Sequence, residues 1–353
     1  MSGVKMALEV EAWIDGDESA KDMLSRVVLT EKRPLLLLPL RGFPLRPGNV
    51  VELVGPSPSA KTHILMQAAI DCILPEEWNG VHYGGLGRLV MFIDLDCRFD
   101  VLRLSHMLKN RIMEANGSSN NVDHDKSGVT ICNGRVESRP TTAFDDKLFV
   151  ACMRRFLHVR CYDSLEFLSV LKTLNYHLQK EREAQGTSVH LLMIDSIGAF
   201  HWVDRATTSL HPGYKSRNGL SLQNVFENVV QEIKKVQLLH SVLVIATKAT
   251  ILGVGDRYTA NDAKWNRKRP FSLHTTPTSG KVLHDVQQNL HREYMPTAWQ
   301  SFVTHRVLLR AKDDCASVSK CRNQSIFTSE WLLPLLTSVE NFMVKEAGVF
   351  SDL

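Results

Sequence analysis

One segment, Gly55-Pro-Ser-Pro-Ser-Ala-Lys-Thr62, limits what this chain can fold into more than any other part of its sequence. It follows residues 50–54, a short apolar run that predicts a buried strand, and it precedes residues 61–74, where apolar positions recur at helical spacing. A strand, a loop and a helix around a pattern close to G-x-x-x-x-G-K-[ST] indicate a P-loop rather than a chance match. The sequence therefore predicts an α/β domain that binds a nucleoside triphosphate.

The chemistry expected of this loop is phosphate binding. Backbone N–H groups converge on the phosphates at a helix N-terminus, where the helix macrodipole also favours an anion. Lys61 is expected to reach the β- and γ-phosphates, and the hydroxyl of Thr62 is expected to ligate Mg²⁺. The residues predicted to bind ATP in this loop are Gly55, Ser59, Ala60, Lys61 and Thr62.

The loop departs from the P-loop pattern in two ways. Ala60 stands where the pattern has its second glycine, so a Cβ enters a tight turn. Pro56 and Pro58 each remove a backbone N–H donor. These departures favour ATP binding with weak or absent hydrolysis. A degraded loop that is kept only for its structure is the alternative.

A second feature supports a nucleotide site. Residues 189–194 form an apolar run that predicts a strand, and Asp195 follows it directly. Ligands of open parallel sheets sit at the carboxyl ends of the strands, and a Walker-B aspartate there holds the Mg²⁺ shell. Asp195 is therefore predicted to bind Mg²⁺ together with Thr62.

Strand and helix patterns alternate along the chain. Strands are predicted at residues 50–54, 89–93, 156–162, 189–194, 241–247 and 301–309, and helices at 61–74, 101–115, 165–183 and around 222–236. This alternation predicts βαβ units, and therefore an α/β fold with a mostly parallel, twisted sheet flanked by helices.

The domain organisation follows from the same patterns. Residues 1–40 are predicted to form a short N-terminal segment, residues 41–310 the core, and residues 311–353 a C-terminal tail. Two polar stretches inside the core, residues 116–128 and 249–298, are predicted to be mobile loops.

Composition excludes some classes of protein. The most apolar run, Leu35–Leu38, is far shorter than the roughly 20 residues that span a bilayer, so a membrane protein is not expected. The seven cysteines are scattered without a Cys-x-x-Cys pair, which indicates a reducing compartment, cytosol or nucleus. The net charge of +4 permits contact with nucleic acid but does not demonstrate it.

Several stretches resemble RecA-like recombinases. Residues 42–55 are similar to the lead-in to that family's P-loop, residues 92–99 look like its second core strand and turn, and Asp195-Ser196 fits the end of its third strand. Together with Trp299 and residues 304–309, they most closely resemble the DNA-repair recombinase paralogues.

This resemblance covers about residues 42–310 and implies a RecA-like P-loop NTPase core. It also implies a role in homologous-recombination DNA repair, in the nucleus, as a subunit of a heteromeric complex with another recombinase paralogue. Residues after about Lys312 match nothing in the family.

Two further positions bear on hydrolysis. The resemblance places Asp96 where active members carry the glutamate that polarises the attacking water, so Asp96 is the catalytic candidate. Its side chain is one methylene shorter, and a misplaced base costs orders of magnitude in rate. Lys248 follows Thr247 where the family has an amide that senses the γ-phosphate, and an ammonium cannot accept a hydrogen bond. A DNA-dependent ATPase activity with a degraded Walker A loop stays open.

Two segments occupy the positions of the family's DNA-contacting loops, residues 197–218 and 249–298. Lysine and arginine outnumber acids between residues 248 and 292, and a basic loop with an aromatic can track a phosphate backbone and stack on a base. The candidates for contact with single-stranded or branched DNA are Lys264, Trp265, Arg267, Lys268 and Arg269. A solvated loop is the alternative, and residues 264–269 could also serve nuclear import.

Assembly is expected to need a partner. The sequence contains no Phe-x-x-Ala motif, and the forty residues ahead of the core leave no room for a helix-hairpin-helix domain, which argues against a homo-filament. Leu35–Leu38 could add to a partner's surface or pack on its own core. Two other functions remain: an active P-loop ATPase or kinase, and an interaction module whose P-loop is vestigial.

Overall fold

The computed structural model describes residues 33–119, 145–209, 221–250, 293–312 and 325–351. Contacts divide the chain into Met1–Pro34 and Leu35–Leu353, and the helices and strands that the structure describes lie in the second unit.

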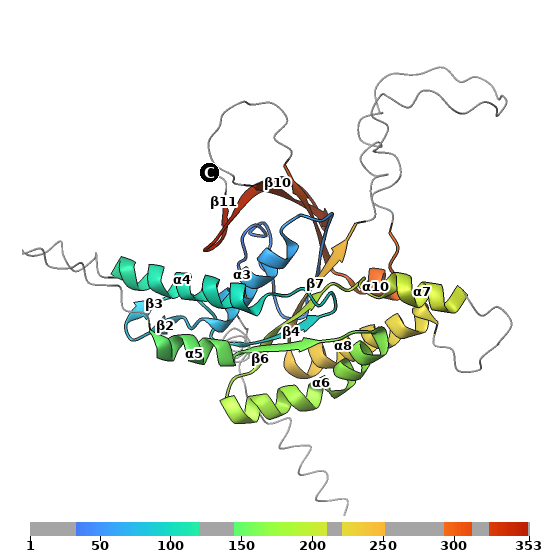
Figure 1. The fold of residues 1–353 in the computed structure, drawn as a ribbon, viewed down its shortest axis with the longest axis horizontal. Helices are drawn as coiled ribbons and strands as arrows, with labels where there is room; N and C mark the ends of the chain where they lie inside the picture. Colours follow the sequence, from blue (N-terminus) through green and yellow to red (C-terminus); the bar gives the residue numbers. More distant parts are fainter. Residues whose placement is uncertain (1–32, 120–144, 210–220, 251–292, 313–324, 352–353) are drawn as a thin grey trace, which may run out of the picture. The chain divides into compact units, whose positions relative to one another are not determined.

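The described strands form a nine-stranded sheet in the order β11-β10-β9-β8-β1-β7-β6-β4-β5 (Figure 1). The neighbours from β8 to β5 pair in parallel, and β9, β10 and β11 continue the sheet in antiparallel pairing. The parallel strands are β1 (Val50–Gly55), β4 (Leu89–Asp94), β5 (Phe156–Arg160), β6 (Val189–Asp195), β7 (Leu243–Ala249) and β8 (His305–Ala311). The antiparallel strands are β9 (Ile326–Leu333), β10 (Leu335–Lys345) and β11 (Gly348–Ser351), and β2 (Glu77–Trp78) and β3 (Val81–His82) form a separate hairpin.

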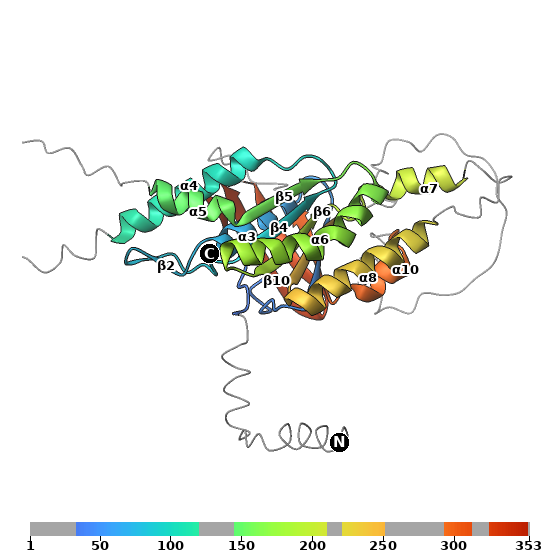
Figure 2. The same ribbon diagram turned by 90° about the horizontal axis from the view of Figure 1, so that it is seen from below.

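Helices cover both faces of the sheet (Figures 1 and 2). The helices α3 (Lys61–Ile73), α4 (Val101–Ser119) and α5 (Asp146–Arg154) contribute to one apolar cluster. The helices α6 (Ser164–Gln185), α8 (Leu222–His240) and α10 (Thr297–Phe302) contribute to the other, and α7 (His201–Ser209) contacts α8. Short polar side chains cap the N-termini of two of these helices: Asp163 accepts hydrogen bonds from two backbone N–H groups of α6, and Ser221 accepts one from α8.

The prediction of an α/β fold with a mostly parallel sheet flanked by helices is confirmed. Parallel strands such as β1, β4 and β6 are buried on both faces and mostly apolar, and such strands appear in a sequence as nearly continuous apolar runs. Three short helices, α5, α7 and α10, were not predicted, and α10 occupies the start of a segment predicted as strand.

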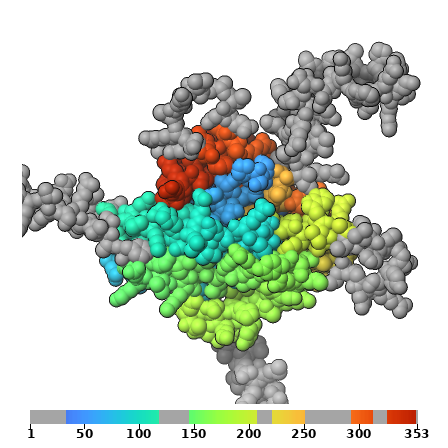
Figure 3. Space-filling view, viewed as in Figure 1, coloured from blue at the N-terminus to red at the C-terminus, as the bar shows by residue number. Residues whose placement is uncertain are grey.

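The segment predicted as a C-terminal tail contains strands of the same sheet. β9 pairs with β8, and β11 lies against α3, where the backbone N–H of Val349 donates to Gln67 Oε1 at 3.4 Å. Figure 3 shows these strands adjoining the surface of the α3 region. The sheet therefore continues past residue 310. These strands were not predicted, because the half-buried strands β9 and β10 lack the continuous apolar runs that mark the buried ones.

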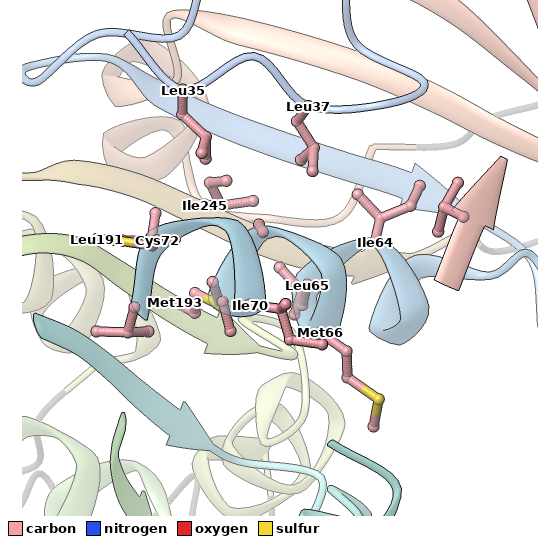
Figure 4. Close-up of a cluster of buried hydrophobic side chains, with 14 of the residues drawn as sticks. Leu35, Leu37, Ile64, Leu65, Met66, Ile70, Cys72, Leu191, Met193 and Ile245 are labelled. Atoms are coloured by element: carbon pink, nitrogen blue, oxygen red, sulfur yellow. The ribbon is translucent and has the colours of Figure 1, made fainter. Parts of the chain in front are cut away.

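The Leu35–Leu38 segment packs on the protein's own core. Leu35 and Leu37 are fully buried, whereas Leu36 between them is 65% exposed. Figure 4 shows both buried side chains in the cluster that includes Ile64 and Ile245. Of the two roles expected for this run, the structure shows the packing role.

The predicted mobile loops lie largely outside the described residues. Residues 116–119 complete α4, and residues 120–128 are not described. Residue 249 ends β7 and residue 250 follows it, residues 293–296 precede α10, residues 297–298 begin α10, and residues 251–292 are not described. Among the helices that the structure describes, none has the length and apolarity required to cross a bilayer.

Candidate functional site

The residues predicted to bind a nucleotide meet at one edge of the sheet. β1 ends at Gly55 and β6 ends at Asp195, so both strands deliver their carboxyl ends to this edge. α3 begins at Lys61 directly after the loop. This edge is where open parallel sheets bind ligands.

Gly55 is fixed by a close approach of β8. A Cβ at this position would lie 2.3 Å from the backbone oxygen of Leu309 and 2.7 Å from Ser59 Oγ. Real Cβ atoms do not approach a backbone oxygen so closely, so only glycine fits without moving β8 or the loop.

The ammonium group of Lys61 is turned into the loop. Its Nζ donates to the backbone oxygens of Gly55 at 2.8 Å and Pro56 at 2.9 Å, and to Ser59 Oγ at 2.9 Å. Burial lowers the pKa of Lys61, while the negative charges of Asp195 and Asp96 oppose that shift. The ammonium group therefore lies inside the loop and donates to neutral oxygen atoms, which the oxygen atoms of a bound anion could replace.

Thr62 and Asp195 lie together as predicted. Thr62 Oγ1 donates to Asp195 Oδ2 at 2.9 Å, and the hydroxyl of Thr247 donates to the other carboxylate oxygen. Burial raises the pKa of Asp195, although the two hydroxyl groups act in the opposite direction. The sequence had not predicted the role of Thr247. Its place near the end of β7 was the available indication, because parallel strands end at the same edge.

Asp96 lies beside this group. Ser196 Oγ donates to Asp96 Oδ1 at 3.3 Å, so the catalytic candidate is attached to the residue that follows Asp195. Burial raises the pKa of Asp96, against the effects of the Ser196 hydrogen bond and of Arg98.

These residues fit a magnesium nucleotide in chemical type. A hydroxyl and a carboxylate are hard oxygen ligands, and Mg²⁺ bound to phosphates uses few protein ligands and keeps several waters. No cluster of three or more His, Cys, Asp or Glu suited to a metal occurs in the described ranges. No side chain caps the N-terminus of α3, where Ala60 adopts a left-handed conformation with φ 61°. The first N–H groups of α3 are therefore suited to an anion.

Lys248 lies at the end of β7, as the sequence predicted, but its side chain points away from the phosphate loop. Thr247 and Lys248 are consecutive on β7, so their side chains point to opposite faces of the sheet. Thr247 reaches Asp195, whereas Lys248 Nζ lies 2.7 Å from Glu293 Oε2 and 3.2 Å from Glu52 Oε2. Lys248 is therefore part of a buried charge cluster and does not face the phosphate loop.

The buried charge cluster consists of Glu52, Lys248, Glu293 and Arg306. Glu52, which is 0% exposed, accepts from Arg306 Nε at 2.5 Å and from the indole Nε1 of Trp299 at 2.8 Å. Burial alone would raise the pKa of Glu293, but the hydrogen bonds and charge of Lys248 hold it below its ordinary value. The cluster joins β1, β7 and β8 to the residues that precede α10.

The predicted DNA-contact residues Lys264, Trp265, Arg267, Lys268 and Arg269 lie outside the described residues. The described part of the first predicted DNA loop, residues 197–209, includes α7, whose Trp202 is half exposed and stacks with Tyr294. The sequence had not predicted this aromatic pair.

The fold and the site define a class: an α/β protein in which a P-loop sequence and a strand-end aspartate meet at the carboxyl edge of a mostly parallel sheet. No protein-family model matches the chain. The chain is 51% identical over 341 residues to the DNA repair protein XRCC2 homolog of Arabidopsis thaliana, a match that covers 96% of this chain and 89% of that protein. It is 24% identical over 341 residues to the DNA repair protein XRCC2 of Mus musculus, covering 97% of this chain and 95% of that protein. The chain belongs to the XRCC2 family.

The resemblance to DNA-repair paralogues that the sequence indicated is thereby confirmed. The matched length also exceeds the residues 42–310 on which that resemblance rested, since it covers 96% of the chain.

Proposed function

We propose that this protein acts in homologous-recombination DNA repair as a RecA-like, ATP-binding subunit of a heteromeric complex with another recombinase paralogue. The observation that carries the proposal is the Thr62–Asp195 pair beside Lys61, at the uncapped start of α3, in a chain of the XRCC2 family. The relatives are named as DNA repair proteins, and repair of the genome implies action in the nucleus.

ATP with Mg²⁺ is the ligand that this arrangement favours. Lys61 would exchange its bonds to loop oxygens for phosphate oxygens, and Thr62 with Asp195 would hold the metal. The bound Mg²⁺ would neutralise phosphate charge. The fold around the loop supports a RecA-like P-loop core, because the nucleotide edge, the strand-end aspartate and the parallel order agree with that family's plan.

Weak or absent hydrolysis is the second part of the proposal. Pro56 and Pro58 remove N–H donors from the loop. Asp96, the candidate for activating water, accepts from Ser196 and has its pKa raised by burial. Lys248 is held by Glu52 and Glu293, so it leaves no charge on the phosphate side of β7.

DNA contact forms the third part. Single-stranded or branched DNA would be contacted by residues 197–218 and 249–298, jointly with the partner paralogue. In the described part of these segments, the exposed ring of Trp202 and the nearby Arg205 support this assignment.

Nucleotide titration tests the first two parts. Full-length protein should bind a fluorescent ATP analogue with Mg²⁺, and Lys61→Ala should weaken binding by roughly 10- to 100-fold, as expected for the loss of a charged hydrogen-bond donor. Lys235→Ala, which removes an exposed lysine of α8, is the matched control. Robust turnover that disappears in Lys61→Ala would instead make the protein an active ATPase. Absence of nucleotide binding, with repair intact in Lys61→Ala cells, would leave an interaction module.

Affinity purification from cells after DNA damage tests the assembly. Another recombinase-family protein should be recovered with this chain. Recovery without any such protein would contradict the heteromeric complex, whatever the nucleotide assay gives.

A further inference from the structure

Two of the free cysteines that the structure describes, Cys97 and Cys161, lie beside each other at the carboxyl edge of the sheet. Cys97 belongs to the turn that follows β4, and Cys161 directly follows β5, the parallel neighbour of β4 (Figure 2). Cys97 Sγ lies 3.7 Å from the backbone oxygen of Cys161. Neither cysteine is assigned to the nucleotide site, and the two are called the thiol pair below.

Hydrogen bonds hold the turn that carries Cys97 against the end of β5. The carboxylate of Asp94, the last residue of β4, accepts from the backbone N–H of Phe99 at 3.2 Å, which closes the turn. Arg160, the last residue of β5, donates to Asp94 Oδ2 and to the backbone oxygen of Phe99, both at 3.2 Å. The backbone N–H of Cys161 donates to the backbone oxygen of Asp94 at 3.1 Å. The start and the end of the turn are therefore both bonded to the end of β5, which keeps the thiol pair together.

The backbone of Cys97 has an uncommon conformation. It is left-handed, with φ 55°. Residues with a side chain seldom adopt this region, and glycine, asparagine or aspartate usually occupies it. The chain thus places a thiol at a position in the turn that favours other residue types, and backbone outliers of this kind gather at functional positions.

The two thiols differ in exposure. Cys97 is partly exposed, whereas Cys161 is 0% exposed. Burial raises the pKa of the Cys161 thiol to about 12, and the negative charges of Glu166 and of ionised Cys97 act in the same direction. Because the thiolate is the reactive form, a dissolved oxidant reacts with Cys97 first, and Cys161 reacts only afterwards with its neighbour. An accessible thiol beside a second, resolving thiol is typical of redox-sensitive sites.

We propose that the thiol pair is a modification site, which hydrogen peroxide converts reversibly to a disulfide. The thiolate of Cys97 attacks one peroxide oxygen and the O–O bond breaks. The hydroxide that leaves takes up the proton that the thiol had lost, and Cys97 becomes a sulfenic acid. The sulfur of Cys161 then attacks that of Cys97, and its proton leaves with the sulfenic hydroxyl as water. A dithiol reductant restores both thiols, so the reduced pair is the resting state in a reducing compartment.

The disulfide would join the turn after β4 to the end of β5 by a covalent bond. Asp96, the candidate for activating water, precedes Cys97 in this turn, and its backbone N–H donates to the backbone oxygen of Asp195 at 3.1 Å. The modification therefore acts at the edge of the sheet where the nucleotide is proposed to bind. Formation of the disulfide does not rest on the proposed function, because it requires only the two thiols and a peroxide.

Peptide mapping of the full-length wild-type protein tests the proposal. The native protein is treated with hydrogen peroxide, its remaining thiols are blocked with iodoacetamide in denaturant, and trypsin is added without a reductant. Trypsin releases Cys97 in the peptide 89–98 and Cys161 in the peptide 161–172, each of which contains one cysteine. The expected product is these two peptides joined, lighter than their sum by two hydrogen atoms. Dithiothreitol should separate them.

Variants distinguish the two steps. Cys161→Ala should prevent the joined product and leave Cys97 as a sulfenic acid that dimedone captures. Cys97→Ser should prevent the joined product and leave Cys161 unoxidised, because the buried thiol does not meet the peroxide. Cys72→Ala is the matched control, since Cys72 on α3 is also 0% exposed, and it should leave the disulfide unchanged.

Three outcomes overturn the proposal. Recovery of both wild-type peptides in the blocked form after peroxide treatment would show that the thiol pair does not react. Cys97 joined to another cysteine, in the same chain or in a second copy, would show that Cys161 is not its partner. Oxidation of Cys97 beyond the sulfenic acid while Cys161 stays free would show that the two sulfur atoms do not meet. None of these outcomes bears on ATP binding, which nucleotide titration tests separately.

Discussion

Replacing Lys248 by methionine separates two roles for this side chain. The resemblance places Lys248 where the family has an amide that senses the γ-phosphate, whereas the structure places its side chain, only 4% exposed, between Glu52 and Glu293. Methionine keeps most of the length of the lysine stem and removes the charge. If Lys248 acts by pairing with the charge cluster, the substitution should lower the stability of the protein. If Lys248 acts by binding the phosphate, the substitution should lower the affinity for ATP.

The size of the effect follows from the contacts that remain. Removing one partner of a buried ion pair costs about 3–5 kcal/mol, because the other charge is left buried without compensation. Glu52 would keep Arg306 at 2.5 Å and Trp299 at 2.8 Å, and Glu293 is 27% exposed. Both features reduce the cost, so the free energy of unfolding should fall by about 3 kcal/mol, the lower end of that range.

Urea denaturation followed by tryptophan fluorescence measures this change, and a fluorescent ATP analogue measures affinity in the same samples. Lys235→Met is the matched control, since Lys235 is 58% exposed and pairs with Glu232 on the surface of α8. It should change the free energy of unfolding by no more than about 0.5 kcal/mol. The reasoning is refuted if Lys248→Met leaves stability unchanged and weakens ATP binding tenfold or more.

Three further predictions concern the loop, the aspartate at the end of β6 and the helix that follows the loop. Ala60→Gly should tighten ATP binding and raise the free energy of unfolding by less than about 1 kcal/mol. The strain that glycine relieves at φ 61° is larger than the stability lost because glycine makes the unfolded chain more flexible. Nucleotide titration measures the affinity, and urea denaturation measures the stability. Asp195→Asn should make ATP affinity nearly independent of Mg²⁺, measured by titration with and without EDTA, because the metal loses its carboxylate. Burial raises the pKa of Asp71 from 3.8 to about 6, so the folded state holds this proton more tightly than the unfolded state. Stability should therefore fall as pH rises from about 4 to about 6 and stay lower above that range, and Asp71→Asn should remove this contribution.

Controls for these three are available in the same chain. Ala69→Gly, inside α3, should destabilise the protein, which would show that the gain at Ala60 is specific to its left-handed conformation. Asp195→Asn should still bind ATP weakly in EDTA, and total loss there would indicate misfolding. An unchanged pH profile in Asp71→Asn would contradict the raised pKa.

The sequence predicted the buried parallel strands and the site at their ends because both depend on local patterns. β1, β4, β6 and β7 are short apolar runs between turns, and Lys61, Thr62 and Asp195 follow such runs at fixed distances. Positions within a motif and at strand ends can therefore be placed without a structure.

Other features depend on contacts that are distant along the chain. The strand-end position of Lys248 was predicted, but the sequence did not show that its side chain lies between Glu52 and Glu293, which belong to other parts of the chain. The Trp202–Tyr294 stack joins α7 to the residues before α10. The half-buried strands β9 and β10 gain their stability from pairing with β8 and with each other, which a single sequence does not display.

The position of β1 in the sheet has a consequence for biosynthesis. β1 lies between β7 and β8, so Val50 pairs with Val244 and Val51 with His305, although β1 is the first of these strands to be translated. The apolar run that leads into the phosphate loop therefore emerges from the ribosome without a neighbour on either side. It must be shielded until most of the chain has been made, because unpaired apolar strands aggregate. A nonsense mutation before His305 would leave one side of β1 permanently open, even with every residue of the loop intact.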